Sequence, residues 1–207
     1  MEQIDKKAAI LIEAEKLFAD QDFDAVSVRD LAKAANVNIA MISYYFGSKE
    51  KLFEELIISR MANSQTTIQS IATDPARTSI EKLMAVVDFY TDRLMNNPNV
   101  HRMINRELSS SNRPELRELL ISKIETNKTY IGKMLEEGKA NGTFRPDADM
   151  GLVMINLFAC IQYIVGSPYY SCKMLDVPTE AQLFDPEFRT RIKTYFKELF
   201  SHYLLKK

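Results

Sequence analysis

Two short helical segments lie close together within residues 27–47, and they constrain the fold of this chain more than any other feature. Ser27 opens the first segment. Together with Asp30 it fits the capping-box pattern, in which the serine side chain accepts a hydrogen bond from a free helix N–H group and the acidic side chain reaches back. Asn36 follows this segment and tolerates the left-handed backbone that a tight helix exit needs.

The second segment begins after Asn38, a favourable N-cap residue, and stops at Gly47. Ile42 and Phe46 are one turn apart in it, so both side chains can point inward. Two short helices separated by about three residues are the helix-turn-helix pattern of DNA-binding proteins. An ordinary helical bundle can contain the same turn, and spacing alone leaves that alternative open.

The remainder of the chain predicts further helices and no strand pattern of convincing length. A first helix carries an apolar stripe over 10–18, and Ser48 is expected to cap a fourth helix that runs to about residue 70. Prolines directly behind the capping residues Asn97 and Asp185 mark two more helix starts. We expect an all-α fold with further helices over 79–96, 98–110, 114–140, 149–166 and 186–205.

The composition is that of a soluble globular protein, with 46% hydrophobic and 27% charged residues. The N-terminus does not resemble a signal peptide, and the apolar run 150–165 is short and contains polar residues, so we expect no membrane span. Cys160, expected in a helix, and Cys172, expected in a loop, form no disulfide framework or zinc site. These features predict a cytoplasmic protein.

The charge of the first 55 residues disagrees at first sight with a nucleic-acid binder, which is usually basic: seven Lys and Arg face eleven Asp and Glu. The distribution is uneven, however. Between Lys33 and Lys51 the positive charges Lys33, Lys49 and Lys51 are opposed by Glu50 alone. The acids cluster in the first helix and the loop after it, which we expect to lie away from DNA.

The stretches "AEKLFADQDFDAVSVRDLAKAANV" and "AANVNIAMISYYFGSKEKLF" resemble the TetR/AcrR family of bacterial transcriptional regulators over about residues 8–56. A weaker similarity appears in "EEGKANGTFRPDAD", which looks like the family's link between its seventh and eighth helices. The family often has Gly where Asn36 stands, Tyr where Ser43 stands and His where Tyr45 stands. Ser43 keeps a hydroxyl but reaches less far than Tyr.

The resemblance implies a three-helix helix-turn-helix domain over residues 1–47, followed by an effector-binding and dimerisation domain over residues 48–207. It also implies the function. The chain is expected to be a ligand-responsive repressor that binds a palindromic double-stranded DNA operator as a homodimer.

The DNA contacts fall into two groups under this resemblance. Phosphate contacts carry no sequence information, whereas contacts to base edges do. Tyr44 can donate its hydroxyl to a phosphate, and Lys49 stands at a helix start, where free N–H groups already attract anions. The expected phosphate contacts are Ser27, Ser43, Tyr44 and Lys49; the expected base-reading residues are Asn38, Ile39, Ala40 and Met41. Three of the latter are apolar and suit thymine methyl groups.

Two apolar helices, 149–166 and 186–205, suggest a dimer interface, because a helix that is apolar on every side must be covered on every side. A four-helix contact with a twofold mate suits a palindromic operator. The alternative is that a single monomer core covers both helices. The expected interface residues are Leu157, Ile161, Ile192, Phe196 and Leu199.

The middle helices supply Met and aromatic side chains with a few polar groups, a mixture found in many small-molecule pockets. The same set could equally be plain core. We expect a small apolar or aromatic effector, with the pocket residues Met84, Tyr90, Met103, Tyr130, Met134, Phe158 and Gln162.

Nothing in the sequence suggests an enzyme, a cofactor or a metal site. The two histidines, His101 and His202, lie in separate helices, and neither is near a plausible cysteine or acid-pair motif. A helical small-molecule-binding module without DNA binding stays open as a second alternative.

Overall fold

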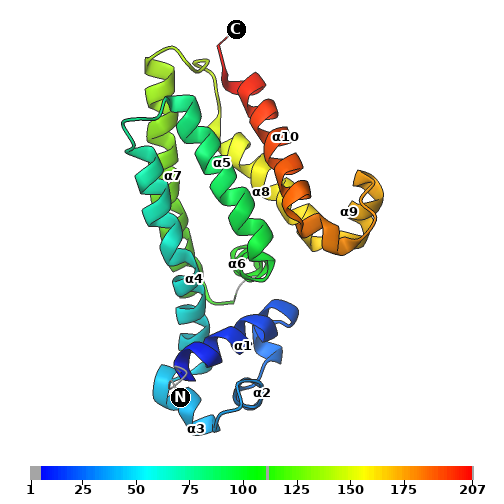
Figure 1. Cartoon of the computed structure of the whole chain (residues 1–207). Helices are drawn as coiled ribbons and strands as arrows, with labels where there is room; N and C mark the ends of the chain where they lie inside the picture. Colours follow the sequence, from blue (N-terminus) through cyan, green and yellow to red (C-terminus); the bar gives the residue numbers. More distant parts are fainter. Residues whose placement is uncertain (1–5, 111, 207) are drawn as a thin grey trace. The chain divides into compact units, whose positions relative to one another are not determined.

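The computed structural model of the chain describes residues 6–110 and 112–206 and confirms an all-α fold (Figure 1). Among these residues the only extended pairing is an isolated antiparallel bridge between Phe144 and Leu205. The helices are α1 (Lys6–Asp20), α2 (Val28–Ala34), α3 (Ile39–Phe46), α4 (Lys49–Ala72), α5 (Ser79–Asn96), α6 (Pro98–Ser110), α7 (Pro114–Ala140), α8 (Met150–Gly166), α9 (Pro168–Leu175) and α10 (Pro186–Leu204), with 3-10 turns η1 (Phe23–Ala25) and η2 (Glu180–Phe184).

The helix boundaries agree with the sequence predictions within one or two residues, with one exception. Residues 168–175 form the short helix α9, which places Cys172 in a helix and not in the predicted loop. Pro168 is the first residue of this helix, a position where its missing N–H group costs nothing. Ser167–Pro168 is therefore the same kind of helix-start signal as Asn97–Pro98 and Asp185–Pro186.

The chain divides into two compact units. The first contains the chain up to Asn63 together with Asn99–Ser122, and the second contains Ser64–Pro98 and Lys123–Lys207. This division differs from the expected boundary after residue 47. The reason is packing, since Leu52 and Leu56 of α4 and Met103 of α6 belong to the buried core of the N-terminal helices.

The helix-turn-helix segment is held by the local interactions that its sequence predicts. Ser27 and Asp30 form the complete capping box. Asn36 has a positive φ of 51°, and the N–H groups of Asn36 and Val37 bond to the carbonyls of Lys33 and Ala32, which is a Schellman motif. Gly47, with φ of 80°, ends α3.

Arginines of α6 hold the end of α1 within the first unit. The guanidinium of Arg106 donates to the carbonyls of Phe18, Ala19 and Gln21 at 3.3, 3.1 and 2.6 Å. The last carbonyls of a helix have no partner inside the helix and carry its negative dipole end, so a cation there is doubly favourable. Arg102 also pairs with Asp20, the last residue of α1, and Arg106 pairs with Asp22 directly after the helix.

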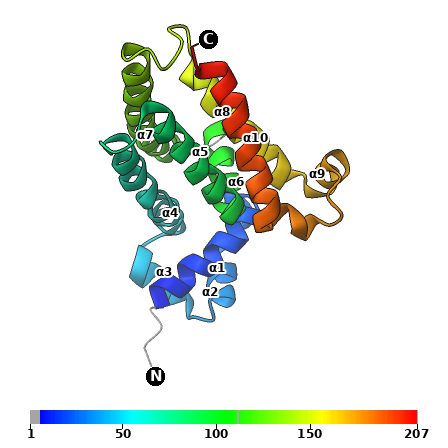
Figure 2. The same cartoon turned by 45° about the horizontal axis from the view of Figure 1, so that its top comes forward.

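The second unit has α5, α8 and α10 in contact around a buried apolar core, which includes Leu83, Val87, Leu157, Ile161 and Phe196 (Figures 1 and 2). Ion pairs connect α5 to α10 at its edge. Lys197 contacts Asp88 and Lys193 contacts Asp92, each at 2.7 Å, and Arg189 also contacts Asp92, at 3.6 Å.

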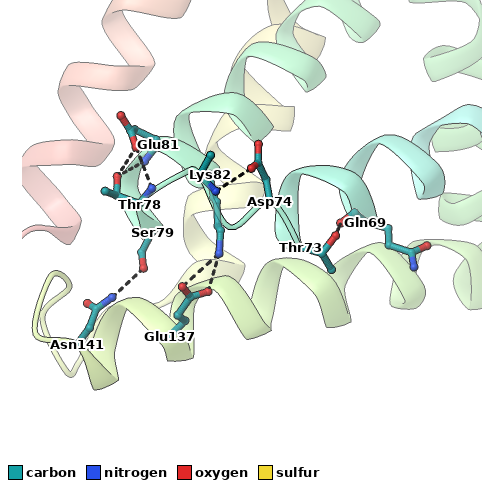
Figure 3. Close-up of polar contacts among 10 residues, drawn as sticks. Gln69, Thr73, Asp74, Thr78, Ser79, Glu81, Lys82, Glu137 and Asn141 are labelled. Carbon is teal, nitrogen blue, oxygen red and sulfur yellow. Dashed lines mark hydrogen bonds and ion pairs between the residues drawn. The ribbon is translucent and has the colours of Figure 1, made fainter.

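The start of α5 is joined to the end of α7 by polar contacts (Figure 3). Lys82, a buried lysine, places its ammonium 2.9 Å from the Glu137 carboxylate, and the Asn141 amide donates to the Ser79 hydroxyl at 3.1 Å. Because a buried ammonium without a partner is costly, Glu137 fixes the register of these two helices.

No single helix among the described residues is long and apolar enough to cross a membrane. The pair α8 and α9 passes that test only jointly, and it is bent by 107°.

Candidate nucleic-acid interface

Helix α3 has one buried face and one exposed face. Ile42 and Phe46 are 1% and 5% exposed and anchor the helix in the core of the first unit, which confirms their predicted inward orientation. The opposite face leaves Ile39, Ala40 and Tyr44 at the surface, and the Tyr44 side chain is 81% exposed. A large aromatic side chain this exposed contributes almost nothing to the core of its own unit.

The two consecutive tyrosines are in different environments. Tyr45 is half-buried and packs against the core of the first unit. The Tyr44 ring contacts it edge-on, with 5.1 Å between the ring centroids. The Tyr44 ring therefore packs on Tyr45, and the Tyr44 side chain stays accessible to a partner outside the chain. Ser43, directly before them, is exposed as well.

The start of α3 is capped by Asn38, whose Oδ1 accepts a hydrogen bond from the Ala40 N–H group at 2.9 Å. This contact leaves the amide nitrogen of Asn38, a donor of two hydrogens, on the exposed side. Met41 is half-buried. Asn38, Ile39 and Ala40 are thus the predicted base-reading residues with the most accessible side chains.

Ser27 has a different arrangement from the one expected of a phosphate contact. Its hydroxyl donates to the Asp30 carboxylate at 2.6 Å and accepts from the Asp30 N–H group at 3.2 Å. The Ser27 hydrogen bonds hold the pKa of Asp30 below its usual value, so the carboxylate beside Ser27 stays ionised. A negative charge here repels a phosphate.

Arg29 is a cation at this helix start that was not among the predicted DNA contacts. It lies in the first turn of α2 and is exposed. A cation in the first turn opposes the helix dipole. Because this position is unfavourable for the helix itself, an arginine here is a sequence signal for an anion bound outside the chain.

Lys49 is half-buried, and its ammonium is directed into the first unit. It donates to the carbonyls of Phe23 and Val26, each at 2.9 Å, and lies 4.1 Å from the centroid of the Phe23 ring. Two of its three N–H groups are therefore used internally. This corrects the expectation that the Lys49 side chain projects outward to a phosphate; Lys51, two residues further along α4, is exposed.

The predicted dimer residues are mostly buried in the chain's own core. Leu157, Ile161, Ile192 and Phe196 are between 0% and 7% exposed, so they have no surface left for a partner. Their assignment to an interface is corrected, because these four side chains pack between α5, α8 and α10. Leu199 is 36% exposed, and the other large apolar side chains that α8 and α10 leave at the surface are Leu152, Ile155, Tyr163 and Tyr195.

The predicted effector residues divide among three places. Tyr90 and Met134 belong to the core of the second unit, and Met84, Tyr130 and Phe158 pack against that core. Met103 is 1% exposed in the core of the first unit, and Gln162 is exposed, so neither lies with the other five. Helix α6 packs with the N-terminal helices, which explains the displacement of Met103.

The second-unit core contains a polar pair that the sequence analysis did not identify. Asn127 and Tyr90 are 7% and 8% exposed, and the Asn127 amide donates to the Tyr90 hydroxyl at 3.3 Å. Burial raises the pKa of Tyr90 to about 12, so its hydroxyl keeps its proton at neutral pH. The Asn127 Oδ1 atom has no hydrogen-bond partner.

A capped helix, a Schellman turn and a second short helix that exposes hydroxyl, amide and apolar side chains define a helix-turn-helix DNA-binding protein. A sequence profile described as bacterial regulatory proteins, tetR family, matches residues 10–56. A second profile, the tetracyclin repressor-like C-terminal domain, matches residues 80–195. The chain belongs to the tetR family, and it is a DNA-binding transcriptional regulator.

Individual relatives agree with this assignment. The chain is 25% identical over 198 residues to the probable HTH-type transcriptional regulator YttP of Bacillus subtilis, covering 95% of this chain and 91% of that protein. It is 30% identical over 145 residues to the HTH-type transcriptional repressor KstR2 of Mycolicibacterium smegmatis, covering 68% of each.

Solved structures share the fold. The ketosteroid transcriptional regulator KstR2 of Mycobacterium tuberculosis has a TM-score of 0.74 at 17% identity, covering 100% of this chain and 98% of that one. The TetR family regulator PfmR from Thermus thermophilus has a TM-score of 0.70 at 22% identity, covering 95% and 99%.

Proposed function

We propose that this regulator is a repressor that binds a palindromic operator as a homodimer and releases it when a small apolar or aromatic molecule binds in the second unit. The observation that carries the DNA-binding part is the exposed face of α3, with Tyr44 81% exposed beside Ile39 and Ala40. A protein that acts on operator DNA works where the chromosome lies, and we propose the cytoplasm.

The proposed contacts follow from this exposure. Tyr44 and Ser43 donate their hydroxyls to phosphates, and Arg29 supplies a cation at the start of α2. Asn38 reads base edges through its free amide nitrogen, while Ile39 and Ala40 contact thymine methyl groups. Few exposed cations take part, so we expect a shallow salt dependence, since each neutralised phosphate adds about 0.9 to the log–log slope.

Selection of bound duplexes from a random library tests the DNA-binding part. We expect enrichment of a sequence with twofold symmetry whose half-sites lie about 34–36 Å apart, the spacing of successive major grooves. Recovery of no enriched sequence would leave a helical binding module without DNA recognition as the better description.

The exposed apolar side chains of α8 support a twofold partner. Leu152, Ile155 and Tyr163 are 61%, 64% and 50% exposed and recur at three- and eight-residue spacing on one helix face, with Ala159 between them. Tyr195 and Leu199 form a similar exposed pair on α10. Exposed apolar residues that gather on neighbouring helices indicate a protein contact, and we propose a second copy of this chain as the occupant.

The effector site is proposed around the Tyr90–Asn127 pair. Its surroundings are aromatic and apolar, since Phe158 meets Tyr90 edge-on at 4.9 Å between ring centroids and Tyr130 and Met134 belong to the same cluster. A buried acceptor without a partner costs about 1–3 kcal/mol. A ligand hydroxyl can donate to Asn127 Oδ1 and accept from the Tyr90 hydroxyl, so we propose an apolar or aromatic effector that carries one uncharged hydroxyl group.

Paired probes test this anchor. Calorimetric titration with 2-naphthol and with naphthalene compares one ring system with and without a hydroxyl. We expect 2-naphthol to bind at least about tenfold more tightly, because this ratio corresponds to the free energy that one hydrogen bond contributes. We expect the Asn127→Leu variant to lose that preference.

Ser171→Ala is the matched control, because Ser171 is another buried polar side chain of the second unit whose oxygen has no hydrogen-bond partner. It should keep the preference for 2-naphthol. Equal affinity of the unmodified protein for both probes would contradict the anchor while leaving the operator selection unaffected.

The proposed switch requires that the effector favours one arrangement of the protein over the other. The coupling between sites is then about 1–3 kcal/mol and reciprocal, so operator DNA weakens effector binding by the same factor as the effector weakens operator binding. Helices α4 and α7 contribute residues to both compact units, which gives such a change a continuous backbone to act through.

A further inference from the structure

Phe23 in the turn η1 is in contact with two cations. Its ring is 7% exposed and lies in an aromatic cluster with Phe18 and Phe53, at centroid distances of 5.6 and 5.1 Å. The Lys49 ammonium lies 4.1 Å from the ring centroid and the Arg113 guanidinium lies 3.9 Å from it. Cation–π attraction is stronger when both groups are withdrawn from water.

The Lys49 contacts connect the start of α4 with the entrance to α2. The two carbonyls that accept its hydrogen bonds belong to Phe23 and Val26, and Val26 directly precedes the N-cap residue of α2. Lys49 thus holds the backbone at the first residue of η1 and directly after its last residue. Any displacement of α4 relative to this turn breaks two hydrogen bonds and the ring contact together.

Arg113 reaches the same ring from the link between α6 and α7. Its guanidinium also forms a two-point ion pair with the carboxylate of Glu107 on α6, which is only 2% exposed. Glu50, in the first turn of α4, is a further acid close to the two cations. Hydrogen bonds from its own backbone N–H group and with Ser48 lower the pKa of its carboxyl most, and the charges of Lys49 and Arg113 lower it further. Arg113 is thus paired with an acid inside the unit, and Lys49 is held there by two carbonyls and the Phe23 ring.

We propose that Lys49 and Arg113 are positioning residues for DNA reading: by holding Phe23 they set the direction in which α2 and α3 leave η1, and Lys49 makes no phosphate contact. This role differs from binding strength in a measurable way. A phosphate contact strengthens binding to all sequences alike. A positioning contact matters for the operator, where the α3 side chains must meet base edges, and matters little for random DNA.

The test uses full-length protein, the operator selected from a random duplex library, and a random duplex of equal length. Affinity for both is measured over a series of salt concentrations. For Lys49→Met we expect the operator-to-random affinity ratio to fall at least about tenfold with the salt slope unchanged. A slope lower by about 0.9 with an unchanged ratio, as for a lost phosphate contact, overturns the proposal.

Two further variants separate positioning from charge. Phe23→Leu removes the aromatic face but no charge, and Phe23 is too buried to contact DNA; we expect the same loss of ratio, and no loss overturns the proposal. Lys51→Met removes an exposed cation two residues from Lys49 and should leave the ratio unchanged. Circular dichroism at the assay temperature establishes whether each variant is folded. If Lys49→Met is unfolded, the result for Phe23→Leu decides the test alone.

Discussion

Tyr44 provides the sharpest residue-scale test of the proposed DNA interface. Tyr44→Phe removes one hydroxyl and keeps the ring that contacts Tyr45. A hydrogen bond to a charged group contributes about 1.5–3 kcal/mol, so we expect operator affinity to fall roughly tenfold to a hundredfold. The melting temperature should not change, because the side chain is 81% exposed.

Tyr45→Phe is the control for this prediction, since Tyr45 is the half-buried neighbour that packs on the core. It should leave operator affinity unchanged. A clear drop in the melting temperature of Tyr44→Phe, measured by circular dichroism, would show that the hydroxyl stabilises the fold and does not contact DNA.

At the scale of single elements, helix α7 contains two glycines in opposite situations. A Cβ atom at Gly138 would lie 2.0 Å from the ring of Phe144, which is 1% exposed, whereas a Cβ atom at Gly132 meets nothing within 4 Å. Only a glycine lets the buried ring of the α7–α8 link lie against the last turns of this helix.

These two glycines give a paired stability prediction. Gly→Ala in a helix gains about 0.5–1 kcal/mol, but overpacking costs about 1–3 kcal/mol. We expect Gly132→Ala to stabilise the protein by the first amount and Gly138→Ala to destabilise it by about 1–2 kcal/mol, measured by urea unfolding. Two variants of equal stability would mean that Phe144 moves aside at little cost.

At the scale of the whole molecule, the dimer proposal makes a prediction about assembly. Ile155→Glu places a charge on the exposed face of α8, where the side chain is 64% exposed and contributes little to the chain's own core. We expect folded monomers in size-exclusion chromatography with light scattering, together with weakened binding to a two-half-site operator.

Ile124→Glu is the matched control, because Ile124 is an exposed apolar residue of α7, 37% exposed, outside the proposed interface. It should leave the dimer intact. Dimers that persist in Ile155→Glu at normal stability would place the contact between copies elsewhere on the surface.

The sequence by itself determined the features that depend on neighbours within a few residues. The capping box at Ser27, the left-handed Asn36 and the Gly47 stop each follow from local hydrogen bonding and backbone sterics, and all three are present. The inward orientation of Ile42 and Phe46 follows from helical periodicity in the same way. Together these residues account for the bounds and the buried face of the helix-turn-helix.

Tertiary structure alone decided the features that join residues distant in the chain. Lys49 meets carbonyls 23 and 26 residues away, and Asn127 meets Tyr90 across 37 residues. Helix α8 is apolar on nearly every side, so its periodicity could not tell which face packs inward, and Leu157 and Ile161 proved to be core. Local rules act over a turn of helix, whereas burial and the partner of a charge depend on which helices pack together.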